Sequence, residues 1–126
     1  MNFHKSDMIA ELVTLPRRFH KLGNVSMFSL LEATNYFEFH DQISEEDIRD
    51  GVVRCPECIQ EWLQYSEDKR TSNGWYVVQN EEGLYETGFV PHAGTRTNRV
   101  QYESSVDACA SFIKHELEDI RLSCAT

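Results

Sequence analysis

Two cysteines in the sequence have the spacing of a pair that holds a metal ion or exchanges electrons. They are Cys55 and Cys58, separated by Pro56 and Glu57. A CxxC pair is half of a structural zinc site or a redox dithiol. Zinc generally needs four ligands, and the sequence has no second CxxC or HxxxH. We interpret the pair as structural, with Cys58 partly buried and Cys55 at a helix cap. A small zinc-binding or redox regulatory module is the alternative function.

The other residue types that commonly do chemistry lack a supporting pattern. The five histidines show no metal-ligand spacing, and only His92, in a turn after Pro91, is a candidate for contact with a partner. The sequence contains no GxSxG elbow, phosphate-binding glycine loop, dinucleotide fingerprint or HExxH pair. We therefore expect a protein that is not an enzyme and that carries no cofactor.

Carboxylates gather in the middle third of the chain. The net charge is −9, and residues 32–68 hold eleven acidic and two basic residues, so this segment carries the whole imbalance. Such charge repels nucleic acid and anionic membranes and attracts basic proteins. We therefore expect a basic protein partner, with no direct contact to nucleic acid or membrane. The candidate binding residues are Glu45, Glu46, Asp47, Asp50, Glu57 and Glu61.

A purely structural role explains only part of this acidic set. Carboxylates in the first turn of a helix complement its dipole, which accounts for Glu45, Glu46 and Glu57. Asp50 and Glu61 lie beyond the first turns of their predicted helices, and like charges four residues apart cost a few tenths of a kcal/mol. A basic partner would offset this cost, and neighbouring aromatic side chains are expected to form the packed centre of the interface.

The elements that must position these residues are predicted to be helices, then a β-meander, then one more helix. Apolar periodicity and capping residues predict helices over 6–13, 26–36, 45–53 and 55–68. Ser44 and Asp47 have the spacing of a capping box at the start of the third of these helices, with Asp in place of Glu. Pro16 is expected to end or redirect the first helix. β-branched and aromatic runs joined by short turns predict strands over 75–80, 84–90 and 96–103. The last helix, over 104–122, follows from apolar residues at helical spacing.

This order of elements predicts an α+β fold. The N-terminal helices and the C-terminal helix are expected to pack on a small antiparallel three-stranded meander. A length of 126 residues fits one domain over 1–126, in which about 1–72 is mainly helical, 74–103 forms the meander and 104–122 the last helix. At least one outer strand must present a sheet edge, and Arg96 and Arg99 are typical of residues that protect it.

The compartment is expected to be the cytoplasm. No apolar run approaches the roughly 18 residues that span a bilayer, and the N-terminus lacks the features of a secretory signal. Cysteines in that compartment stay reduced.

Part of the sequence resembles a known family. The stretch from Trp62 through Tyr76, followed by a hairpin and by the Ser-Val-Asp-Ala-Cys helix start at 105–109, is similar to bacterial immunity proteins of contact-dependent-inhibition and other polymorphic toxin systems. The resemblance covers about residues 44–122. It implies an antidote that binds a cognate toxin domain tightly and blocks its active site or substrate access. Many such toxins are basic nucleases, and the family implies no catalytic residues.

Overall fold

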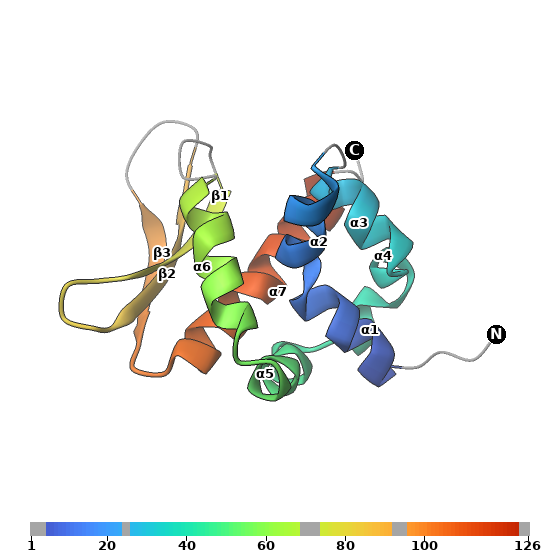
Figure 1. Cartoon of the computed structure of the whole chain (residues 1–126). Coiled ribbons are helices and arrows are strands. Elements are labelled where there is room, and N and C mark those ends of the chain that lie inside the picture. Colours follow the sequence, from blue (N-terminus) through green and yellow to red (C-terminus); the bar gives the residue numbers. More distant parts are fainter. Residues whose placement is uncertain (1–4, 24–25, 69–73, 92–95, 124–126) are drawn as a thin grey trace.

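The computed structural model describes residues 5–23, 26–68, 74–91 and 96–123 (Figure 1). Helices precede a sheet, and one long helix follows it. The N-terminal helices are α1 (Lys5–Val13), α2 (Leu15–Leu22), α3 (Met27–Ala33), α4 (Tyr36–Phe39), a 3₁₀ turn (His40–Gln42), α5 (Glu45–Arg54) and α6 (Cys58–Asp68). The remaining elements are β1 (Gly74–Gln79), β2 (Tyr85–Val90), β3 (Thr97–Tyr102) and α7 (Ser105–Ser123).

The three strands form the expected antiparallel meander, in the order β1-β2-β3. Tyr76 pairs with Gly88 across the first ladder, and the ladder between β2 and β3 has an irregularity between Thr87 and Phe89. The β1–β2 turn is closed by Asn80, whose side-chain oxygen accepts hydrogen bonds from two backbone N–H groups of the turn. The α+β fold, with helices packed on the meander, is confirmed.

The long helix α7 joins the sheet to the N-terminal helices. It runs diagonally between the two halves in Figure 1 and packs against α5, α6, β1 and β2. Side chains of α6 and α7 meet in the core, where Trp62 and Phe112, both fully buried, stack edge to face. The indole N–H of Trp62 donates to the carbonyl of Val13 at 2.9 Å, which satisfies its one polar group. Both halves therefore share a single core.

Two helix boundaries differ from the sequence prediction, and one helix was not predicted. The first helix ends at Val13, before Pro16, as expected, but a new helix, α2, begins at Leu15 with Pro16 in its first turn. The helix expected over 26–36 is interrupted at Asn35, whose φ of 69° is left-handed, so α3 and α4 are separate. The last helix before the sheet begins at Cys58 and not at Cys55, since residues 56 and 57 form a turn.

Local capping chemistry fixes the start of α5. Ser44 accepts a hydrogen bond from the Asp47 N–H at 3.1 Å, and the Asp47 carboxylate accepts one from the Ser44 N–H at 2.9 Å. This reciprocal box satisfies two donors that a helix start otherwise leaves unpaired. It confirms the capping box predicted for this helix, with Asp in place of Glu.

None of the helices in the described ranges has the length and hydropathy that a membrane span requires.

Candidate functional site

The acidic residues predicted to bind a partner fall into distinct environments. Asp47 is the most constrained: besides capping α5, its carboxylate forms an ion pair with Lys5 of α1 at 2.8 Å. Partial burial opposes its charge, but the bonds from Lys5 and Ser44 outweigh burial, so the pKa of Asp47 lies below its usual value. Asp47 therefore has a structural role that needs no partner.

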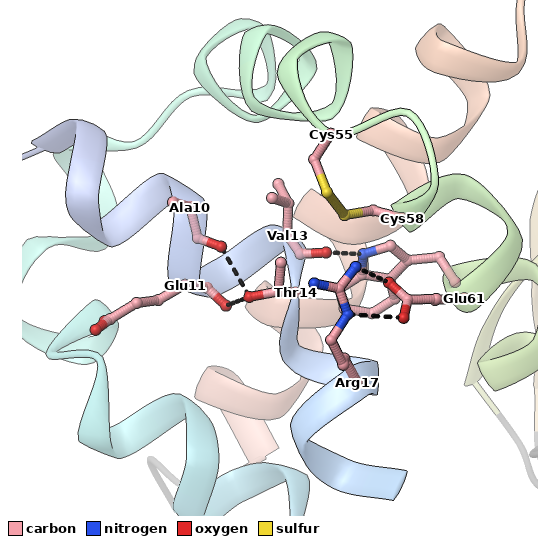
Figure 2. A network of polar contacts seen from close by, with 9 residues as sticks. Ala10, Glu11, Val13, Thr14, Arg17, Cys55, Cys58 and Glu61 are labelled. Atoms are coloured by element: carbon pink, nitrogen blue, oxygen red, sulfur yellow. Dashed lines mark hydrogen bonds and ion pairs between the residues drawn. A yellow bond between two sulfur atoms is a disulfide. The ribbon is translucent and has the colours of Figure 1, made fainter. Parts of the chain in front are cut away.

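Glu61 is also occupied within the fold. Both of its carboxylate oxygens accept hydrogen bonds from Arg17 of α2, at 2.9 and 3.0 Å (Figure 2). The hydrogen bond and charge of Glu61 raise the pKa of Arg17, and Glu57 adds to this effect. A bidentate pair between residues 44 apart in sequence ties α2 to α6. Because α6 begins at Cys58, Glu61 lies in its first turn and not beyond it, and its pairing with Arg17 explains a carboxylate that sequence reasoning attributed to a partner.

The remaining carboxylates of α5 point to solvent. Glu45, Glu46 and Asp50 are exposed, and none forms an ion pair with another residue in the described ranges. Glu46 and Asp50 lie four residues apart, so they share one side of α5. Val53, three residues after Asp50, continues this side and is 53% exposed. We call Glu45, Glu46, Asp50 and Val53 the α5 surface.

A shallow hollow borders the α5 surface. It is lined by Glu45, Glu46, Arg49, Tyr102, Asp107 and Ala110. Arg49 forms an ion pair with Asp107 of α7 across this hollow, and its pKa is raised chiefly by the hydrogen bond with Asp107. Tyr102 is the partly buried aromatic side chain beside the acids. Trp62, the aromatic closest in sequence to Glu61, is fully buried and is not available to a partner.

Glu57 lies apart from the α5 surface, in the turn that joins α5 to α6. It is exposed, and its charge acts on Arg17. Thus the structure brings Glu45, Glu46 and Asp50 together on one helix, and places Glu57 and Glu61 near Arg17.

The two cysteines of the CxxC sequence are joined by a disulfide, shown in Figure 2. This overturns the prediction that they stay reduced. The turn at residues 56–57 brings the two Cα atoms to 5.7 Å, within the range that a disulfide bridges. Cys58 is fully buried, where the sequence predicted partial burial, and Cys55 is a helix cap as predicted, at the C-terminus of α5.

The zinc alternative gains no support from the described part of the chain. It contains no group of three or more histidine, cysteine, aspartate or glutamate side chains that could hold a metal ion. His92, the histidine considered for partner contact, lies outside the described residues.

Sequence reasoning missed a buried carboxylate on the sheet. Glu86 is 4% exposed and accepts hydrogen bonds from Tyr76 and from Arg99. The Arg99 bond is the main reason that the pKa of Glu86 lies below its usual value, while burial raises the pKa of Tyr76 to about 12. Arg96 also pairs with Glu86, so the two arginines expected to protect a sheet edge are anchored on the sheet face. The sequence held a signal for this cluster: Glu86 lies on one predicted strand, and Arg96 and Arg99 lie on the strand predicted to pair with it.

The two sheet edges are unequal. On β1, the Val77 N–H donates to the hydroxyl of Ser66 on α6, which covers this edge. On β3, residues 97–101 are exposed. The sequence left open which outer strand presents an edge, and β3 is the more open of the two.

Comparisons with protein-family models, with curated proteins and with solved structures found no match to this chain.

Proposed function

We propose that this chain is an intracellular immunity protein that binds a cognate basic toxin domain, of the nuclease type, and neutralises it by protein–protein contact. The observation that carries the proposal is the α5 surface, where three exposed carboxylates and one exposed valine lie on the same helix. Charge repulsion among unpaired acids on one helix is relieved when a cationic surface docks. The resemblance of residues 44–122 to immunity proteins, which rests on the sequence pattern alone, implies the same partner class.

The α5 surface is held in place before any partner arrives. The opposite side of α5 is buried through Ile48 and Val52, which are both fully buried. Gly51 packs so closely against Ile9 of α1 that a β-carbon there would collide with it. With the capping box at its start, α5 is a rigid support, and a rigid surface loses little conformational entropy on binding.

Charge and packing would contribute to different steps of binding. Glu45, Glu46 and Asp50 would steer a basic domain and raise the association rate, an effect that salt screens. Val53, and Tyr102 in the hollow beside Glu45 and Glu46, would supply apolar contact, which slows dissociation. This division replaces the expectation that several aromatic side chains form the centre of the interface.

The proposal is tested by growth rescue and complex formation. If the neighbouring reading frame encodes a large secreted protein that ends in a toxin domain, that domain is the toxin to test. Co-expression of the chain should restore growth to cells that produce this domain, and the two purified proteins should co-elute as a stable complex. Growth arrest that persists despite normal levels of folded protein would overturn the proposal. A double variant, Glu46→Lys with Asp50→Lys, should protect less than the matched charge reversals Glu81→Lys and Glu82→Lys in the β1–β2 turn.

A further inference from the structure

The disulfide between Cys55 and Cys58 joins the end of one helix to the start of the next. Cys55 is the C-cap of α5, and its N–H bonds to the carbonyl of Val52 at 3.0 Å. Cys58 is the first residue of α6, and its N–H bonds to the carbonyl of Cys55. The bridge therefore closes one short turn that already has backbone hydrogen bonds of its own.

The two sulfurs differ in their access to solvent. Cys55 is partly exposed, whereas Cys58 is fully buried. Thiol–disulfide exchange requires a thiolate to approach one sulfur of the bridge, and the sulfur that is not attacked becomes the leaving group. The geometry therefore favours attack at Cys55, with Cys58 leaving.

The leaving sulfur is well placed to carry negative charge. Cys58 begins an eleven-residue helix, and the positive end of a helix dipole stabilises a thiolate. Glu61, one turn further on, would oppose that charge, but Arg17 binds both of its oxygens (Figure 2). Burial of Cys58 also opposes the charge, so its protonation should follow soon after bond cleavage.

We propose that Cys55–Cys58 is a reversible thiol–disulfide exchange site whose reductant is a dithiol, either a thioredoxin-type protein or a small molecule. A thiolate of the dithiol attacks Cys55 Sγ, the bridge breaks, and Cys58 Sγ leaves with the electron pair and takes a proton. The second thiolate then attacks the mixed disulfide and releases Cys55. Two electrons pass to the bridge, and the dithiol becomes a disulfide.

The fold around this site does not depend on the bridge alone. Trp62 is hydrogen-bonded to Val13, and Arg17 pairs with Glu61, so α6 stays attached to the α1–α2 segment when the bridge opens (Figure 2). Reduction should therefore proceed in the folded protein. This distinguishes an exchange site from a purely structural bridge, which is released only by unfolding.

A third cysteine provides an internal control. Cys109 of α7 is a free cysteine, 2% exposed, and burial raises its pKa to about 12. A buried thiol with a raised pKa is inert toward disulfides and alkylating agents. Labelling of Cys109 therefore reports unfolding and separates it from exchange at the bridge.

The test uses the full chain with Cys124→Ser in every variant. The oxidised protein is treated near neutral pH with dithiothreitol, with reduced thioredoxin or with glutathione, and free thiols are alkylated and mapped by mass spectrometry. We expect dithiothreitol or thioredoxin to release Cys55 and Cys58 while Cys109 stays unlabelled, and oxidised glutathione to restore the bridge. Reduction that occurs only together with Cys109 labelling would overturn the proposal.

Two variants test which sulfur is attacked. In Cys58→Ser, Cys55 should form a mixed disulfide with oxidised glutathione roughly 100-fold faster than Cys58 does in Cys55→Ser, because exposure and thiolate access control the rate. Equal rates in the two folded variants would contradict the assignment. If a variant does not fold, brief alkylation of the wild-type chain during partial reduction replaces it. Trapped mixed disulfide must then be found on Cys55, and its presence mainly on Cys58 would refute the mechanism.

Discussion

Removing the carboxylate should have opposite effects on the free energy of unfolding at the two aspartates of α5, Asp47 and Asp50. In Asp47→Ala, the Ser44 N–H loses its acceptor and Lys5 loses its ion pair. Loss of a capping bond costs about 1 kcal/mol, and a partly exposed ion pair adds a few tenths. Alanine returns about 0.5 kcal/mol through its better helix propensity. We expect a net loss of about 1 kcal/mol in the free energy of unfolding.

Asp50→Ala is the matched control, on the same helix and with the same atoms removed. Asp50 caps nothing and has no ion pair among the described residues, and it lies four residues from Glu46. Its replacement relieves a like-charge pair and improves helix propensity, so stability should stay constant or rise by about 0.5 kcal/mol. Urea unfolding followed by tryptophan fluorescence would show a midpoint lowered by roughly 0.5–1 M for Asp47→Ala alone.

The pH dependence gives this prediction a second test. The pKa of Asp47 lies below its usual value in the folded protein, so its carboxylate stabilises the fold when ionised. The contribution is complete above the unfolded pKa of about 3.9 and is lost as the pH falls through the folded pKa. The stability gap between wild type and Asp47→Ala should therefore narrow as the pH falls from about 5 to about 2. A constant gap, or an equal loss in Asp50→Ala, would refute the division between structural and surface carboxylates.

Three further substitutions test how the core and the sheet are held. Glu86→Gln should lower stability by about 1–2 kcal/mol, because the buried Tyr76 hydroxyl loses a charged acceptor. In the same variant the pKa of Tyr76, about 12 in the wild type, should fall, as measured by absorbance titration. Trp62→Phe should cost about 2–3 kcal/mol in thermal or urea unfolding, since the Val13 carbonyl is left without its donor. Gly51→Ala should cost about 1–2 kcal/mol by the same assay, because crowding against α1 exceeds the gain in helix propensity.

Local signals in the sequence were sufficient for most elements. The meander and α7 were predicted because alternation and helical spacing depend on neighbours along the chain. The Ser44–Asp47 capping box is equally local and is confirmed. The break at Asn35 was missed, since a left-handed asparagine ends a helix without any change in apolar spacing. The end of α1 before Pro16 was predicted, but α2 was missed, because proline also fits the first turn of a new helix.

Only part of the candidate site could be predicted from the sequence, because ion pairs between distant segments have no local sequence signal. Glu61 was grouped with the other acids, although Arg17 neutralises it from another helix. Asp47 was grouped likewise, although its capping role was visible and its pairing with Lys5 was not. Composition alone shows how much charge a segment carries, whereas the fold decides which charges remain for a partner.

The association rate with the toxin domain is the measurement that bears most directly on the α5 surface. Wild type, Asp50→Lys and the control Glu81→Lys would be compared by stopped flow at low and high salt. At low salt we expect Asp50→Lys to associate about tenfold more slowly and Glu81→Lys to differ less than about twofold, with the gap shrinking as salt screens the charges. Equal slowing by both substitutions, or none by either, would contradict a docking role for the acids of α5.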